Sequence, residues 1–309
     1  MLDSQTVRIS SAIALTLFWN TNLSSAAAPP EMTHAPIRLV SFAPSCSELV
    51  ESLKAGNCLV GVCKFCDIPP GDNVQRVGDF TTANMEKLTQ LKPDAILTVK
   101  GQEALIHSLS KNGFKVITFS NSKMSDISHN LVEIGKLTKH LNSAQEQVRN
   151  FENSVSELKK LCSGAKKPAV FLCVWPQPLL TVGNTSFLNE AITICGGRNI
   201  AASLNEPYPH FSQERLVIEN PEVVIMPAEA QTAEYLKRAP WSQLRASKTQ
   251  RVYFLDKGIS DKLNRPSTEV IDGLYWLAAK FHPELEGELK SWQKKTHANL
   301  KNKITNQHF

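Results

Sequence analysis

Apolar residues recur at spacings of three and four along the middle of the chain, from Leu141 to Cys162. Charged side chains fill the intervening positions, and neither glycine nor proline interrupts the stretch. This pattern predicts an amphipathic helix with one apolar stripe, roughly 33 Å long at about 1.5 Å per residue. The stripe consists of Leu141, Ala144, Val148, Phe151, Val155, Leu158 and Cys162. The helix is either an ordinary core helix or a strut between two lobes, and the patterns on both sides of it favour the strut.

Short apolar runs alternate with helical patterns on both sides of this helix, which is typical of α/β folds with mostly parallel sheets. Before the helix we expect strands at Ile37–Phe42, Leu59–Cys63, Ala95–Val99 and Lys115–Phe119, and helices at Cys46–Lys54, Met85–Leu91 and Glu103–Ser110. After it we expect strands at Ala169–Val174, Val223–Met226 and Arg251–Leu255, and helices at Phe187–Cys195, Tyr235–Arg238, Thr268–Lys280 and Leu285–Lys301. Ser45 and Glu48 have the spacing of a capping box at the start of the first helix.

The two halves also share a local unit. Glu86 precedes Pro93 by seven residues, and Glu214 precedes Pro221 by the same number. A polar residue that can cap a helix stands two positions before each glutamate, and an apolar run follows each proline. We therefore expect two matched, Rossmann-like α/β lobes, over residues 36–140 and 165–309, joined by one long rigid helix over residues 141–164. Such lobes form a cleft between them, and clefts between lobes are where ligands usually bind.

Length and composition agree with this organisation. A chain of 309 residues is long enough for two lobes that each bury a core of their own. The hydrophobic fraction of 42%, the charged fraction of 20% and the net charge of +5 are those of a soluble globular protein. Lysines gather only near the C-terminus, where they indicate a solvated helix end. We therefore expect no nucleic-acid partner, and we expect a monomer.

The first 28 residues have the pattern of a signal peptide. Arg8 is followed by a mostly apolar run from Ala12 to Trp19, and small residues then precede Pro29. The apolar run is too short to cross a membrane as a helix. We expect cleavage near Ala28 and export of the mature protein to the periplasm or another extracytoplasmic space.

The seven cysteines include one CxxC pair, Cys63 and Cys66. Zinc would need two more ligands at compatible spacing, and a redox site of the thioredoxin type would place the pair at the start of a helix. Neither pattern is present, so we expect an incidental pair or a local disulfide, and no metal site. Cys46 offers an alternative, because a thiol in the first turn of a helix can act as a nucleophile. No motif supplies Cys46 with a base, so we expect no catalytic residue.

A series of motifs, in order along both halves, resembles a known family. In the first half these are Arg38–Ser45 with Glu48, Leu59–Val62, Asp67–Pro70, Val77–Asp79, Asn84–Glu86 and Leu91–Asp94. In the second half they are Thr181–Gly183, Ser186–Asn189, Cys195–Ile200, Tyr208-Pro209, Ser212–Glu214, Trp241, Arg251–Tyr253 and Asn264–Pro266. They resemble the helical-backbone (class III) substrate-binding proteins of ABC importers for vitamin B12, ferric siderophores and haem, and most of all the cobalamin-binding members.

The resemblance implies a role for the two glutamates of the repeated unit. In such proteins the glutamates at the positions of Glu86 and Glu214 dock onto arginines of the membrane permease, and a pair between a carboxylate and an arginine fixes orientation as well as adding energy. A structural role is the alternative, since a glutamate in the first turn of a helix stabilises the helix dipole.

The resemblance also implies the ligand and its contacts. A corrinoid is large, flat-sided and partly apolar, so aromatic faces and a few polar groups would hold it. The matching positions are Phe65, Phe80, Trp175 and Tyr208, together with His210, unless these aromatics pack in the core of each lobe. We expect capture of a corrinoid in the cleft for delivery to an ABC permease. The alternatives are a ferric siderophore or haem as the ligand, favoured by Lys100, Arg198 and Lys257, and an enzyme that uses Cys46.

Overall fold

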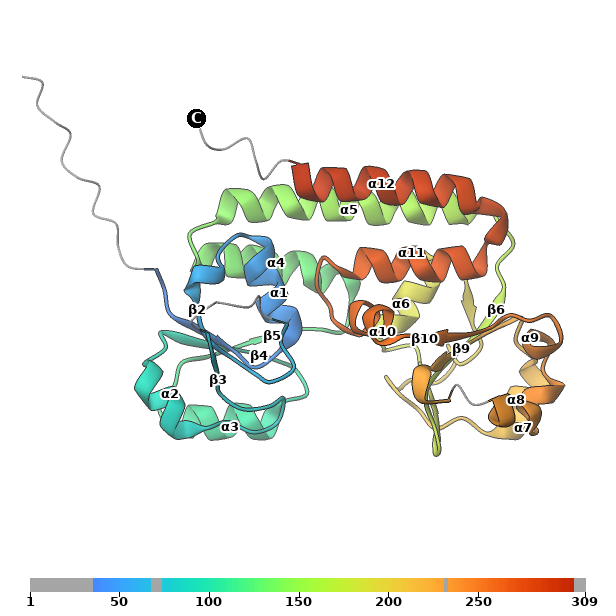
Figure 1. The fold of residues 1–309 in the computed structure, drawn as a ribbon, viewed down its shortest axis with the longest axis horizontal. Coiled ribbons are helices and arrows are strands. Elements are labelled where there is room, and N and C mark those ends of the chain that lie inside the picture. The colour runs from blue at the N-terminus through green and yellow to red at the C-terminus, as the bar shows by residue number, and fades with distance from the viewer. Residues whose placement is uncertain (1–35, 68–73, 231–232, 303–309) are drawn as a thin grey trace, which may run out of the picture. The chain divides into compact units, whose positions relative to one another are not determined.

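The computed structural model describes residues 36–67, 74–230 and 233–302. The expected signal peptide, residues 1–28, lies outside this part of the chain. The first half of the described chain contains β1 (Leu39–Ser41), α1 (Pro44–Ser52), β2 (Leu59–Val62), β3 (Gln75–Arg76), α2 (Met85–Leu91), β4 (Ala95–Val99), α3 (Glu103–Lys111), β5 (Val116–Phe119) and α4 (Met124–Leu137). The long helix α5 (Leu141–Ser163) follows (Figure 1).

The second half begins with β6 (Ala169–Pro176), β7 (Leu179–Thr181), α6 (Phe187–Ile194), β8 (Arg198–Asn199), α7 (Gln213–Glu219) and β9 (Val223–Pro227). It continues with α8 (Ala233–Lys237), α9 (Arg245–Lys248), β10 (Val252–Leu255), α10 (Lys257–Asn264), α11 (Val270–Phe281) and α12 (Glu286–Asn302). Among the described residues, no helix combines the length and the apolar character that crossing a membrane requires.

The strands form one sheet in each half of the described chain. The first sheet has the order β3-β2-β1-β4-β5, and every pairing in it is parallel. The second has the order β10-β9-β6-β7, with β8 beside the start of β6, and only the β6–β7 pairing in it is antiparallel. The expectation of an α/β fold with mostly parallel sheets is confirmed. Parallel strands end at one edge of their sheet, so the loops that follow them gather there.

The helix that the apolar stripe predicts is α5, which runs without a break over 23 residues. Phe151 and Leu158 of the stripe are buried, and the exposed face carries Glu152 and Lys159. The partner helix α4 lies close to α5, because a Cβ at Gly135 would come within 2.5 Å of the Ala144 Cβ. Helix α12 covers another part of α5, where the Trp292 indole donates a hydrogen bond of 3.1 Å to the Ser154 carbonyl (Figure 1).

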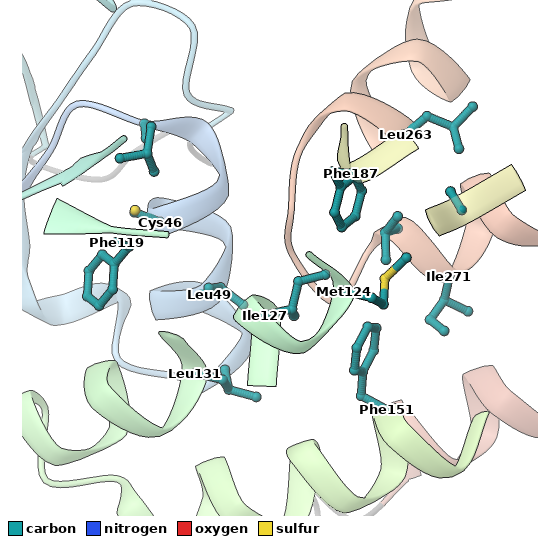
Figure 2. Packing of buried hydrophobic residues seen from close by; sticks show 14 of the residues in the cluster. Cys46, Leu49, Phe119, Met124, Ile127, Leu131, Phe151, Phe187, Leu263 and Ile271 are labelled. Atoms are coloured by element: carbon teal, nitrogen blue, oxygen red, sulfur yellow. The ribbon is translucent and has the colours of Figure 1, made fainter. Parts of the chain in front are cut away.

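One hydrophobic core connects the two halves. Figure 2 shows that Met124, at the start of α4, lies between Ile127 on one side and Phe151 and Ile271 on the other. All four side chains belong to a single buried cluster that reaches from the first sheet to α6, α11 and α12. A second cluster lies on the other face of the second sheet, where alternate residues of β6 contribute to each cluster. The larger core is therefore shared between the halves, whereas the second cluster belongs to the second half alone.

The first helix begins earlier than its sequence predicts. Ala43 is the N-cap of α1 and Pro44 opens it, without a hydrogen bond from a capping side chain. Proline suits this place because its ring fixes a helical φ and it has no N–H to satisfy. The predicted capping box of Ser45 and Glu48 is therefore wrong, and the Glu48 carboxylate has partners in the other half of the chain.

Candidate functional site

The two predicted aromatics of the first half follow neighbouring strands. Phe65 lies just after β2 and Phe80 lies after β3, and these strands pair in parallel through Gly61–Gln75 and Val62–Arg76. The two loops stay in contact beyond the strands, because the Lys64 N–H donates a hydrogen bond of 2.8 Å to the Gly78 carbonyl. Phe65 and Phe80 therefore lie at the same edge of the first sheet, as expected for residues that follow the ends of parallel strands.

Polar side chains hold the loop that carries Phe80. The Asp79 carboxylate accepts hydrogen bonds of 2.8 Å from the Thr81 and Thr82 N–H groups, and these bonds hold the pKa of Asp79 at about 2. Gln102 is buried and donates to the Phe80 carbonyl at 2.6 Å and to the Phe42 carbonyl at 3.0 Å. Sequence analysis did not single out Gln102, which ties this loop to the end of β1.

The predicted residues of the second half gather around a hairpin. Trp175 of β6 pairs with Leu180 of β7, and Leu180 in turn forms an antiparallel bridge with His210. Residues that pair directly across a sheet point to the same face, so the side chains of Trp175, Leu180 and His210 lie next to one another. The segment before His210 follows β7, because the Thr181 N–H donates to the Pro209 carbonyl at 3.1 Å. Tyr208 therefore lies beside this group.

The exposure of these aromatics distinguishes them from core residues. Phe65 is 49% exposed, Trp175 is 50% exposed and Tyr208 is 48% exposed. The Trp175 indole N–H donates to the Gln177 carbonyl at 2.8 Å, so the polar end of this ring is satisfied within the hairpin while its face stays open. Phe80 differs, because it is half-buried and packs against the shared core.

A charged cluster that sequence analysis did not predict connects the two halves. The Arg265 guanidinium, directly after α10, donates to Glu48 of α1 at 2.8 Å and also to Asp67. The Ser267 hydroxyl donates to the other Glu48 oxygen at 2.6 Å. Arg265 further donates to the Phe65 carbonyl at 3.3 Å, so the cluster also holds the loop that carries this aromatic. Arg265 lies in the motif Asn264–Pro266, but the motif by itself predicted no role for this arginine.

Burial and charge act on this cluster in opposite directions. Burial raises the pKa of Glu48, although the hydrogen bonds from Ser267 and Arg265 oppose that shift. Burial lowers the pKa of Arg265, but the hydrogen bonds that it donates to Asp67 and Glu48 outweigh this effect, so the net shift is upward. The contacts of Arg265 with Glu48 and Asp67 have the geometry of ion pairs. Such a cluster costs free energy when one partner is removed, because the other charge then stays unpaired.

A cavity of about 500 Å³ lies beside this cluster. It is lined by Glu48, Glu51, Ser52, Asp67, Gly258, Asp261, Lys262, Arg265, Thr268 and Glu269. Apart from Gly258 these residues have charged or polar side chains, and the aromatics predicted to bind the ligand are not among them. We therefore assign this cavity to the contact between the halves and not to the ligand.

The two predicted docking glutamates occupy equivalent places. Glu86 is exposed in the first turn of α2, where the Asn84 side chain caps the helix by accepting from the Lys87 N–H. Glu214 is exposed in the first turn of α7, where the Ser212 hydroxyl accepts from the Arg215 N–H. Both predicted caps are confirmed.

Each of these helices also ends in the same way. The C-cap residues Lys92 and Asn220 are left-handed, and the next strand begins three residues later.

The structure argues against the alternative in which Cys46 acts as a nucleophile. Its side chain is buried, and burial raises the pKa of the thiol to about 12. The thiol therefore stays protonated at neutral pH, although it lies in the first turn of α1. In the part of the chain that the structure describes, no cluster of histidine, cysteine and carboxylate side chains could hold a metal ion.

Comparisons with known proteins define the class. The family model described as "Periplasmic binding protein" matches residues 39–258. The chain therefore belongs to the periplasmic binding protein family, and it is a solute-binding protein and not an enzyme. The family resemblance of the motifs is thereby confirmed.

Particular relatives narrow the class. The "Vitamin B12-binding protein" of Vibrio cholerae serotype O1 is 25% identical over 240 residues, which are 77% of this chain and 86% of that protein. The "Vitamin B12-binding protein" of Salmonella paratyphi A is 28% identical over 204 residues, or 65% of this chain and 76% of that protein.

Solved structures agree on the fold. The crystal structure of the periplasmic vitamin B12 binding protein of Vibrio cholerae matches with a TM-score of 0.70 and 25% identity, over 84% of this chain and 99% of that one. A periplasmic heme binding protein from Pseudomonas aeruginosa matches with a TM-score of 0.69 and 24% identity, over 80% of this chain and 93% of that one. The fold is that of the class III periplasmic binding proteins.

Proposed function

We propose that the chain is exported and binds a corrinoid between its two lobes, for delivery to the permease of an ABC importer. The lobes would be those expected from the sequence, residues 36–140 and 165–309 on either side of the backbone helix, and the protein would act as a monomer. The names of the relatives support a cofactor of this type.

The observation that carries the proposal is the exposure of three aromatic side chains. Among the described residues, the large hydrophobic side chains that stand exposed are Phe65, Trp175, Tyr208, Val217 and Ile218. Three of these five are aromatics that the sequence assigns to the ligand, and exposing them costs free energy unless something covers them. They come from both halves, as contacts to the two sides of a flat ligand would require. His210, beside Trp175, would add a polar contact, and Phe80 would line the site from its half-buried position.

The test is a titration of the purified protein with cyanocobalamin, haemin and a ferric siderophore, followed by tryptophan fluorescence and visible absorbance. We expect saturable binding of cyanocobalamin at micromolar concentration or below. Trp175→Ala removes one aromatic face that would stack on the ligand, so the Kd for cyanocobalamin should rise roughly tenfold. Ile218→Ala removes an even more exposed apolar side chain that lies outside the proposed site, and it should bind as the wild type does. If only haemin or only the siderophore binds, that molecule is the ligand and the proposal of a corrinoid is wrong.

We further propose that Glu86 and Glu214 dock onto arginines of the permease. Support comes from their exposure and from their matched places in α2 and α7 (Figure 1). Glu86→Lys and Glu214→Lys should each abolish uptake through the cognate permease and leave ligand affinity unchanged, because reversed charge repels the arginines. Glu152→Lys reverses an exposed charge on α5 and should leave uptake intact. Normal uptake by both of the first two variants would contradict the docking role.

A further inference from the structure

The CxxC pair forms a tight turn next to the proposed ligand site. The Cys66 N–H donates a hydrogen bond of 3.2 Å to the Cys63 carbonyl, so residues 63–66 form a β-turn. The ends of a β-turn lie within about 7 Å of each other at Cα, which overlaps the range that a disulfide can bridge. The two sulfur atoms are 3.2 Å apart and both side chains are buried.

The backbone around the turn is held firmly in this geometry. The Arg76 guanidinium donates to the Cys63 carbonyl at 2.7 Å and to the Cys66 carbonyl at 2.6 Å. The Cys63 N–H donates to the Ser41 carbonyl at 2.9 Å, which ties the start of the turn to the end of β1. Side-chain rotation alone can therefore bring the two sulfurs together, and the backbone need not move.

The two thiols are unequal in acidity. The hydrogen bond from Cys66 is the main reason why the pKa of Cys63 falls to about 7, and the charge of Arg76 lowers it further. The pKa of Cys66 is raised by the same hydrogen bond and by burial. A pair of this kind has one thiol that ionises near neutral pH and can begin an exchange reaction.

We propose that Cys63 and Cys66 form a structural disulfide that closes the turn. The oxidant is an external disulfide, either of a thiol-oxidising protein or of a small molecule such as oxidised glutathione. The Cys63 thiolate attacks one oxidant sulfur and releases the other as a thiol. Deprotonated Cys66 then attacks the Cys63 sulfur, and the second oxidant thiol leaves. The two cysteines lose two electrons and two protons, and the oxidant gains them.

Burial determines when this exchange takes place. Because both side chains are buried in the folded chain, the exchange occurs while the chain folds, once the turn has formed and before it packs against the core. The finished bond is then shielded from thiols in the native protein. An exported protein meets oxidising conditions during folding, as the reaction requires.

The disulfide would fix the turn that carries Phe65 and leads to Asp67. Phe65 is a proposed ligand contact, and Asp67 pairs with Arg265 of the other half. This consequence for ligand binding rests on the proposed corrinoid binding, whereas the bond itself rests only on the proposed export.

The experiment is alkylation of the exported, denatured protein before and after reduction, read by mass spectrometry. Of the seven cysteines, we expect five to react before reduction and all seven after it. Trypsin cleaves after Lys64, inside the turn, so the peptides 55–64 and 65–76 should stay joined until they are reduced. Seven reactive cysteines before reduction, or a bond between other cysteines, would overturn the proposal.

Two variants locate the bond. Peptide 55–64 also contains Cys58, which is buried outside the turn. Cys58→Ser should keep the two peptides joined, whereas Cys63→Ser with Cys66→Ser should separate them. The double variant should melt about 2–6 °C lower, because the unfolded chain regains freedom that the bond removes. If it folds and cyanocobalamin binding weakens as well, the turn positions Phe65. If no corrinoid binds even to the wild type, the peptide result still decides the disulfide.

Discussion

The two halves of the molecule agree where they carry the exposed glutamates and differ where the ligand would bind. Helices α2 and α7 have side-chain caps, left-handed C-caps and a following parallel strand in common. Even the next contact is repeated, since the Asp94 N–H donates to the Arg38 carbonyl and the Glu222 N–H to the Ala169 carbonyl, both at 2.8 Å. At the other sites the halves diverge. The first half presents its aromatics on loops after parallel strands, whereas the second presents Trp175 on an antiparallel hairpin and Tyr208 on the segment beside that hairpin.

Under the proposed docking role, this difference would separate the surfaces that face the permease from the surfaces that hold the ligand. A repeated unit with the same acid at the same place suits a partner with two equivalent binding points, as a pair of matched permease subunits would provide. A ligand has no such symmetry, so the surfaces that hold it are free to differ. The predictions below test whether the two halves behave alike where they look alike, and differently where they do not.

The largest effect should come from Arg265, which crosses from one half to the other and has no counterpart in the first half among the described contacts. Arg265→Ala leaves the largely buried Glu48 carboxylate without its cation. We expect a loss of about 3 kcal/mol in the free energy of unfolding, measured by urea titration. The proposed corrinoid affinity should fall too, since Arg265 holds the Phe65 carbonyl.

A second arginine provides the control. Arg245 forms an ion pair of 3.4 Å with Glu222 inside one half, and its side chain is 52% exposed. Arg245→Ala should cost about 0.5 kcal/mol or less, as exposed pairs do. If Arg265→Ala and Arg245→Ala lower the free energy of unfolding equally, the Arg265 ion pair between the halves stabilises the fold no more than an exposed surface pair.

The caps of the repeated unit should show the next largest effect. Asn84→Ala and Ser212→Ala each remove the acceptor for one N–H in the first turn, at 3.0 Å and 3.1 Å. Each substitution should lower the free energy of unfolding by about 1 kcal/mol. Because the two caps are equivalent, the two losses should agree closely in urea titrations. A difference of more than about 1 kcal/mol would show that the repeated unit is equivalent in geometry but not in energy.

Local patterns predicted this repeated unit because its determinants are local. The caps, the glutamates and the prolines act within a few residues of the chain, and so does the apolar stripe of α5. The exposed aromatics were found by matching motifs, and their exposure fits a binding role. Helix α4 was missed although Ile127, Leu131 and Ile134 recur at helical spacing, so its signal was available.

The remaining features depend on partners far away in the sequence. Glu48 has the spacing of a capping residue. Its carboxylate instead accepts hydrogen bonds from Arg265 and Ser267, which lie more than 200 residues further along the chain. Cys46 has the position of a reactive thiol, yet packing of the shared core removes the water that its thiolate would need. Neither outcome can be derived from spacing, because each is decided by which helices pack together.

Two acids at matched helix positions should respond alike to acid and differently to salt. Asp126 in the first turn of α4 accepts from the Ser122 and Lys123 N–H groups, whereas Asp272 in the first turn of α11 pairs with Lys262 and His297. Burial opposes ionisation at both positions. The hydrogen bonds of Asp126, and the contacts of Asp272 with Lys262 and His297, outweigh it and lower both pKa values.

A carboxyl with a lowered pKa in the folded state stabilises the fold above its unfolded pKa of about 3.9, and this stability is lost as the pH falls through the folded pKa. Asp272→Asn should therefore cost about 0.5–1 kcal/mol at pH 7 and progressively less below about pH 4. High salt should reduce this cost for Asp272→Asn more than for Asp126→Asn, because salt screens ion pairs. Urea titrations across pH and salt concentration measure both effects. A cost for Asp272→Asn that grows in acid would contradict the assignment.

The smallest effect on stability should come from the docking glutamates themselves. Glu86 and Glu214 stand exposed at the positive ends of α2 and α7, so each contributes a few tenths of a kcal/mol through the helix dipole. Glu86→Gln and Glu214→Gln should each lower the free energy of unfolding by about 0.3 kcal/mol, while uptake falls sharply because the charge facing the permease is gone. If the free energy of unfolding falls by more than about 1 kcal/mol and uptake falls only as much as the loss of folded protein explains, the role of the two glutamates is to stabilise the helices. If uptake falls while stability hardly changes, the matched acids serve a partner outside the chain.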